Sequence, residues 1–125
     1  MSNEAIENFK ERIIKIFKDE IVALILYGSF VRGEYSKYSD IDILIVTKDK
    51  DKIREGIYNI AYDIDLEYDV LISLLFLTPE EVEKLIKNGS PLMEDIISEG
   101  VILYDKDEAF KRICERALKI EQRVS

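Results

Sequence analysis

The stretch LYGSFVRGEYSKYSDIDILIV, residues 26–46, contains two aspartates, Asp40 and Asp42, at the start of a strongly apolar run. Residues two apart in a strand point to the same face, so the two carboxylates would lie side by side and repel each other. On an edge strand, Asp42 could simply face water. The residues of 41–46 instead make both faces of the strand largely apolar, which favours a central, buried strand with the acids at its rim. A divalent cation such as Mg²⁺ would reverse the repulsion between the carboxylates.

A Gly-Ser pair, Gly28-Ser29, stands shortly before these aspartates and directly after the apolar run 21–27. Glycine allows the backbone to turn sharply and to approach a ligand closely, because it has no Cβ. The residues from Ser29 to Arg32 can form a helical turn, whose N–H groups together with the Ser29 hydroxyl would bind an anion. The pattern is not a P-loop, since the chain has no G-x-x-x-x-G-K-[ST] motif.

The composition limits which kinds of site are available. The chain has no histidine, which excludes histidine-based catalytic triads and nearly all zinc sites. Its one cysteine, Cys114, cannot form an internal disulfide and lies in the apolar phase of an expected helix, so a buried hydrophobic role is favoured over a nucleophilic one. The acids that remain suit a hard cation.

The length and charge of the chain set further expectations. Its 125 residues predict a single domain over 1–125, and its net charge of −8 disfavours direct binding to nucleic acid. No apolar run approaches the length of a membrane span, and the N-terminus lacks the pattern of a signal peptide. We therefore expect a cytoplasmic protein without membrane contact.

Apolar spacing and turn residues predict a layered α+β (α/β) domain, with one small mixed β-sheet of about four strands flanked by helices. Thr78-Pro79-Glu80-Glu81 has the pattern of a helix start with a capping box. Asp63 and Asp65 are expected in a loop. The expected helices are 3–18, 49–61, 79–87, 91–99 and 106–122, and the expected strands are 21–27, 41–46, 66–77 and 101–104.

Gly28-Ser29, ten further residues and then Asp40-x-Asp42 together resemble the signature of the minimal nucleotidyltransferases, small members of the polymerase-β-like superfamily that includes kanamycin nucleotidyltransferase. The stretch LTPEEVEKLIKNGSPLMEDIISEGVILYD, residues 77–105, is similar to the C-terminal half of that family. The resemblance covers residues 21–105 and implies the nucleotidyltransferase fold.

The resemblance also implies roles for individual residues. Gly28 and Ser29 would bind the β- and γ-phosphates of the nucleotide, while Asp40 and Asp42 would be catalytic and would hold Mg²⁺. Arg32 belongs to the same motif; it would either support the charge of the phosphates or pair with a local carboxylate or helix end. The implied activity is magnesium-dependent transfer of a nucleoside monophosphate, AMP from ATP as donor, to a hydroxyl group.

The family generally places a third catalytic and metal-binding acid on a neighbouring strand. Within LEYDVLISLLFL, residues 66–77, Asp69 is our candidate, because a strand over this range would put it on one face with Glu67, Leu71 and Ser73. Glu67 is the second candidate. In many relatives the acid directly precedes the Ile-Ser pair, which is the position of Leu71 here. In that case the chain would bind nucleotide but transfer it poorly.

Small stand-alone members of the family are commonly encoded beside a helical HEPN-type protein, an RNase toxin, and act as its antitoxin by adding AMP to a tyrosine. The resemblance therefore implies a nucleoside triphosphate and a helical HEPN-type partner as ligands, and it is compatible with a homo-oligomer. Two alternatives stay open. The chain could neutralise such a partner by contact alone, or it could modify a small hydroxylated molecule such as an aminoglycoside, whose positive charge would suit an acidic surface.

Overall fold

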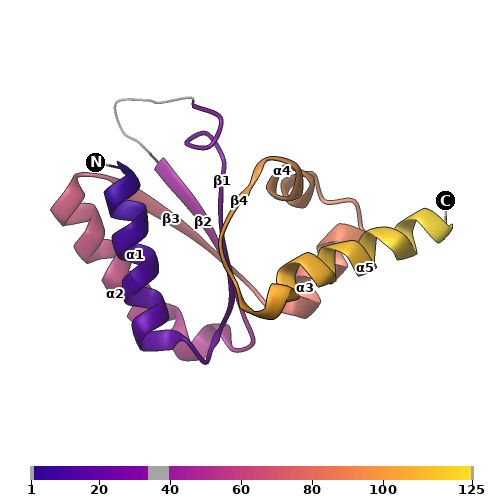
Figure 1. The fold of residues 1–125 in the computed structure, drawn as a ribbon, viewed down its shortest axis with the longest axis horizontal. Coiled ribbons are helices and arrows are strands. Elements are labelled where there is room, and N and C mark those ends of the chain that lie inside the picture. The colour runs from indigo at the N-terminus through magenta and orange to yellow at the C-terminus, as the bar shows by residue number, and fades with distance from the viewer. Residues whose placement is uncertain (1, 34–39, 125) are drawn as a thin grey trace.

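The computed structural model describes residues 2–33 and 40–124, which form one sheet with helices on both of its faces (Figure 1). The predicted α+β architecture with a four-stranded mixed sheet is confirmed. The described elements are α1 (Ser2–Phe17), β1 (Ile21–Tyr27), β2 (Asp40–Thr47), α2 (Lys50–Tyr68), β3 (Leu71–Leu77), α3 (Pro79–Lys87), α4 (Pro91–Glu99), β4 (Val101–Asp105), the short 3₁₀ helix η1 (Lys106–Glu108) and α5 (Ala109–Val124).

The strands lie in the order β3-β2-β1-β4. β1 is antiparallel to both β2 and β4, whereas β2 and β3 are parallel and are joined by the crossover helix α2. β2 is thus an interior strand, as its apolar faces predicted: residues from Ile41 to Val46 are fully buried except for Asp42.

Helices cover the two faces of the sheet separately (Figure 1). On one face, α1 and α2 pack over side chains such as Ile43 and Ile45, with Phe9 and Ile57 in the same core. On the other face, α3, α4 and α5 pack over side chains such as Leu44. Asp40 and Asp42 share the strand face of Leu44, so they lie on the side of α3, α4 and α5.

The prediction for residues 49–77 is wrong in one respect. The helix does not end near residue 61 but continues to Tyr68, and the third strand begins only at Leu71. Ile64, which is fully buried, continues the helical spacing of the buried isoleucines before it. Asp63 and Asp65 are therefore helical and not loop residues.

Asp69 ends this helix. It adopts a left-handed conformation, with φ of 53°, and its N–H donates to the carbonyl oxygen of Asp65. The Asp65 carboxylate accepts a hydrogen bond of 2.9 Å from the N–H of Ile72 and so ties the end of the helix to the new strand. Two acids thus define the boundary between α2 and β3.

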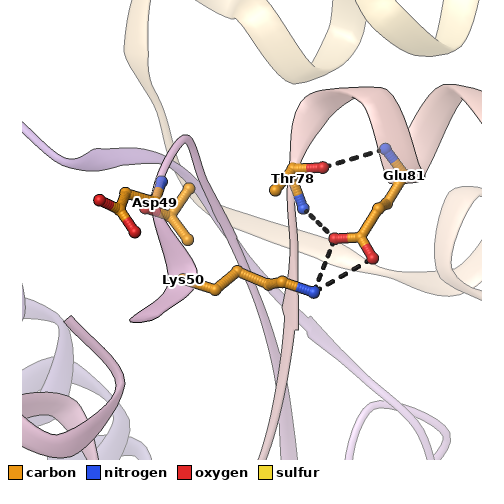
Figure 2. A network of polar contacts seen from close by, with 5 residues as sticks. Asp49, Lys50, Thr78 and Glu81 are labelled. Atoms are coloured by element: carbon orange, nitrogen blue, oxygen red, sulfur yellow. Dashed lines mark hydrogen bonds and ion pairs between the residues drawn. The ribbon is translucent and has the colours of Figure 1, made fainter. Parts of the chain in front are cut away.

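The capping box predicted at the start of α3 is confirmed (Figure 2). The Thr78 hydroxyl accepts from the N–H of Glu81 at 3.2 Å, and the Glu81 carboxylate accepts from the N–H of Thr78 at 2.9 Å. Lys50, the first residue of α2, forms an ion pair of 2.9 Å with the same Glu81 carboxylate. These contacts join the start of α2 to the start of α3 at one end of the sheet.

The closing helix and the cysteine also follow the sequence expectation in outline. The predicted helix 106–122 begins with the short η1, and regular α-helix starts at Ala109. Cys114 is buried, and burial raises the pKa of its thiol to about 11. A thiol with such a pKa is almost fully protonated at neutral pH, which fits the hydrophobic role predicted for it. Among residues 2–33 and 40–124, no helix is long and apolar enough to cross a membrane.

Candidate active site

The site expected from the sequence forms where β1 ends and β2 begins. The two strands are antiparallel, and their register pairs Tyr27, the last residue of β1, with Asp42. The turn that follows β1 therefore lies at the same end of the strands as the two aspartates. The segment 34–39, which separates the turn from β2 along the chain, lies outside the described residues.

Gly28 brings the turn into direct contact with Asp42. It has a φ of +84°, which residues with a side chain rarely adopt. A Cβ at this position would collide with Oδ2 of Asp42 and would lie 3.2 Å from its Cγ. The Asp42 carboxylate thus rests over the backbone of Gly28, and only glycine leaves room for it.

The residues after Gly28 form the helical turn that was predicted. The N–H of Arg32 donates to the carbonyl oxygen of Gly28 at 3.3 Å, and the N–H of Gly33 donates to that of Phe30 at 3.2 Å. Ser29, the first residue of this turn, is partly exposed. The helical turn is confirmed, and the binding of phosphate by Gly28 and Ser29 stays a prediction.

The two aspartates influence each other electrostatically. Asp40 is exposed and Asp42 is half-buried. Partial burial, and next the negative charge of Asp40, raise the pKa of the Asp42 carboxyl, while the Arg32 guanidinium acts in the opposite direction. Burial and the charge of Asp42 also raise the pKa of Tyr27. Negative charge therefore gathers on this face at the rim of the sheet, as the spacing of the aspartates predicted.

Arg32 forms an ion pair with a helix and also brings positive charge to the site. Its guanidinium forms an ion pair of 3.1 Å with Glu99, the last residue of α4. The pair is exposed on both sides, so its contribution to stability is small. Of the two roles considered from the sequence, Arg32 has a structural partner, the carboxylate at the end of α4, and its positive charge also acts against the raised pKa of Asp42; phosphate support by Arg32 stays a prediction.

The third carboxylate is not where a strand over 66–77 would have placed it. Glu67 lies in α2 and pairs with Arg12 at 3.2 Å, and Asp69 is an exposed residue at the end of the same helix. The strand argument for Asp69 is therefore wrong. No group of three or more acidic or thiol side chains that could hold a metal ion occurs in the described part of the chain.

The register of β2 and β3 shows which residues do lie beside the aspartates. Leu71 pairs with Asp40, and Ser73 pairs with Asp42. Leu71 is 52% exposed, in a strand at the edge of the sheet. Asp69 precedes Leu71 by two residues and stands just before the strand. Its role as third carboxylate stays a prediction.

Sequence reasoning missed two neighbours of the acidic pair. Tyr27 and Ser73 lie on either side of Asp42 in one row across three strands. Paired residues of adjacent strands share a face, so both side chains point to the same side as the aspartate. In the sequence, Ser73 stands out as a polar residue inside an apolar strand. That it lies beside Asp42 could be learned only from the register of β2 and β3.

The acidic pair fits a Mg²⁺ ion that is bound together with a nucleotide. Mg²⁺ prefers oxygen ligands and is commonly held by one or two carboxylates plus substrate phosphates and water. Partial burial and next the charge of Asp40 raise the pKa of Asp42, and a cation beside the two carboxylates would offset both effects. Because the described part of the chain holds no group of three such ligands, the two adjacent carboxylates match this mode better than an all-protein metal site.

Comparisons with known proteins identify the family. The family model described as polymerase beta, nucleotidyltransferase matches residues 11–109. A Methanocaldococcus jannaschii protein provisionally named as a protein adenylyltransferase, MJ1305, is 31% identical over 99% of this chain and 86% of its own length. A second provisional protein adenylyltransferase of that organism, MJ0141, is 43% identical over 56% of this chain and 73% of its own length.

Solved structures share the fold at low sequence identity. A toxin–antitoxin structure with AMP-PNP matches 92% of this chain and 88% of its own chain, with a TM-score of 0.55 and 17% identity. The spectinomycin adenyltransferase AAD(9) from Enterococcus faecalis, with ATP and spectinomycin, matches 82% of this chain and 56% of its own, with a TM-score of 0.60 and 17% identity. By its family model and its relatives, this chain belongs to the polymerase-β nucleotidyltransferase family.

Proposed function

We propose that this chain is a magnesium-dependent protein adenylyltransferase, which transfers AMP from ATP to the hydroxyl of a tyrosine on a helical HEPN-type toxin partner and so acts as its antitoxin. The observation that carries the proposal is the contact between the turn and the acidic pair, in which the Asp42 carboxylate rests over Gly28. This contact would bring a nucleotide's phosphates and a metal ion to one place. The names of the Methanocaldococcus jannaschii relatives support protein adenylylation.

In this proposal, the turn after β1 binds the phosphate tail of ATP. The Ser29 hydroxyl donates a hydrogen bond to a phosphate oxygen, and Arg32 adds positive charge nearby. Asp40 and Asp42 would hold Mg²⁺, which would supply positive charge to the α-phosphate and to the departing pyrophosphate. The half-buried setting of Asp42 strengthens these electrostatic effects relative to open water.

The acceptor is a hydroxyl group whose proton must be removed as the new phosphate ester forms. We assign this role to the Asp69 carboxylate, which is exposed at the end of α2 and precedes the strand residue that pairs with Asp40. A carboxylate can accept this proton directly or through one water molecule. Asp40 and Asp69 are exposed, so a partner protein could present a side chain to them.

The experiment is label transfer from ATP to the protein encoded beside this chain. Label at the α-phosphate should appear on the partner in the presence of Mg²⁺, whereas label at the γ-phosphate should not, because adenylyl transfer releases pyrophosphate. Asp40→Asn with Asp42→Asn should abolish the transfer. Asp63→Asn with Asp95→Asn removes the same charge from exposed positions elsewhere and should leave the transfer intact.

Transfer of the γ-label instead would contradict adenylylation.

A second candidate function is neutralisation by contact alone, and it is favoured by the register that sets an exposed leucine, Leu71, opposite Asp40. In that case the wild type would bind its partner tightly and inhibit it without transferring label. Transfer to an aminoglycoside but not to the partner would indicate the small-molecule alternative.

A further inference from the structure

A second pocket, with a volume of about 340 Å³, lies at the end of the sheet opposite the acidic pair. Its wall includes Ile21, the first residue of β1, and Lys48, which follows the end of β2. The turn at Gly28 follows the other end of β1, about 20 Å away at roughly 3.4 Å per residue. We call this pocket, with the residues named below, the basal pocket.

The basal pocket gathers positive charge on an acidic chain. Two acids, Asp19 and Asp107, also face it. The whole chain carries a net charge of −8, so an excess of cations around one pocket runs against the composition. The cations come from the β2–α2 turn, η1 and α5: they are Lys48, Lys106, Arg112 and Arg116.

Most of these cations are not engaged by carboxylates. In the part of the chain that the structure describes, the ion pairs include neither Lys48, Lys106 nor Arg112. Arg116 forms a pair of 3.4 Å with Glu83, but its side chain is 60% exposed, so little energy holds it there. Like charges around one cavity repel each other, and an anion in the pocket would relieve that repulsion.

The floor of the basal pocket is apolar and buried. Ile21, Val22 and Ile113 are buried core residues that form part of its wall. The volume is at the lower end of the range for small-molecule sites. A buried apolar floor with exposed cations around it suits a compact ligand that carries several negative charges, since long lysine and arginine side chains can reach over it.

We propose that the basal pocket binds a small phosphate-rich anion, either a free polyphosphate or the triphosphate group of a nucleotide. Arginine recognises phosphate through paired hydrogen bonds, and lysine contributes a compact charge. The proposal does not depend on the function proposed for the acidic pair, because it uses none of the same residues.

The test measures binding of inorganic tripolyphosphate and, separately, of ATP by calorimetry in the presence of EDTA. Without a divalent cation, Asp40 and Asp42 repel both ligands, so the acidic site should be silent. Lys106→Gln with Arg112→Gln should weaken binding at least tenfold. The control, Lys84→Gln with Lys111→Gln, removes two exposed cations that do not line the pocket and should change affinity less than twofold.

The outcomes also identify the source of the phosphate. Equal affinities for tripolyphosphate and ATP would show that the phosphates alone are recognised, whereas tighter binding of ATP would show that the apolar floor contacts the nucleoside. Absence of saturable tripolyphosphate binding at millimolar concentration would overturn the proposal, and so would equal binding by both double variants. Loss of binding in Asp40→Asn with Asp42→Asn would also overturn it, since the ligand would then occupy the acidic site.

Binding only to a long RNA strand, and not to tripolyphosphate, would likewise refute a small-anion site. Transfer activity serves as an independent reading. The variant Lys106→Gln with Arg112→Gln should transfer AMP as fast as the wild type, because both residues lie at the far end of the sheet from the acidic pair. If the adenylylation proposal is wrong, neither the wild type nor the variants will transfer label. Binding of tripolyphosphate to the basal pocket should then be unchanged.

Discussion

Replacing Gly28 with alanine should damage the site far more than the fold. The added methyl group meets two separate obstacles. The first is the backbone, since a φ of +84° costs a residue with a Cβ about 1–2 kcal/mol. The second is the Asp42 carboxylate, because the new Cβ would collide with Oδ2 and lie 3.2 Å from Cγ. The carboxylate therefore has to move away.

The size of that movement sets the expected functional loss. Ordinary contacts of a Cβ begin at 3.4 Å, so Asp42 must shift or turn by about an ångström. A misplacement of about 1 Å in a catalytic constellation can cost on the order of a hundredfold in rate. We therefore expect Gly28→Ala to lose about 1–2 kcal/mol of unfolding free energy, together with roughly a hundredfold of transfer rate.

Gly89→Ala is the matched control for the backbone effect. Gly89 has a φ of +69°, lies in the turn between α3 and α4, and has no atom within 4 Å of the position of an added Cβ. Urea denaturation should show a similar loss of stability, about 1–2 kcal/mol, for both variants. Only Gly28→Ala should lose the extra stabilisation that Mg²⁺ with ATP gives to the wild type in thermal unfolding.

One result would refute this reasoning. If Gly28→Ala and Gly89→Ala were stabilised equally by Mg²⁺ with ATP, and to the same degree as wild type, then the position of Asp42 would not depend on the missing side chain. The close contact between the turn and the acidic pair would then have no part in binding.

Three further substitutions test single residues. Asp42→Asn should raise the unfolding free energy at neutral pH by no more than about 1 kcal/mol, because partial burial, and next the charge of Asp40, disfavour the ionised carboxylate in a site that is still screened by water. The raised pKa of Asp42 means that its ionised form destabilises the folded state, so the gain should vanish below the ordinary pKa of 3.8, and an unchanged gain at about pH 3 would contradict this cause. Ser29→Ala should change stability by no more than about 1 kcal/mol yet weaken ATP binding or transfer by clearly more, and unchanged binding and transfer would remove the phosphate role of Ser29. Asp69→Asn should keep the fold, because asparagine tolerates the left-handed conformation, and should reduce transfer roughly a hundredfold or more; equal transfer would remove the role proposed for Asp69.

Local patterns in the sequence were sufficient for most of the fold. The apolar faces of 41–46 predicted an interior strand, and Thr78 with Glu81 predicted the start of α3, because strand alternation and helix capping are local properties. The end of α2 was mistaken because LEYDVLISLLFL is mostly apolar, and a short apolar run fits either a helix or a strand. Ile64, spaced four residues after Ile60, was the available signal for a longer helix.

The site was predictable only where its residues lie close in sequence or share one strand. Asp40 and Asp42 follow from a two-residue period, and the turn after Gly28 follows from the glycine itself. The pairing of Leu71 with Asp40 depends on the parallel register across the crossover helix, and the ion pair between Arg32 and Glu99 joins residues 67 positions apart. Such contacts are set by tertiary packing, which no local pattern contains.

The central claim is that the turn after β1 and the two aspartates of β2 form one magnesium-dependent nucleotide site. The most direct test is calorimetric titration of ATP, with and without Mg²⁺, into the wild type and into Asp40→Asn with Asp42→Asn. The account predicts that Mg²⁺ adds a tight ATP-binding event in the wild type, beyond the magnesium-independent binding proposed for the basal pocket, and that the double variant loses this magnesium-dependent part. Equal magnesium-dependent affinity for ATP in the two proteins would contradict the account, because the carboxylates would then not hold the metal.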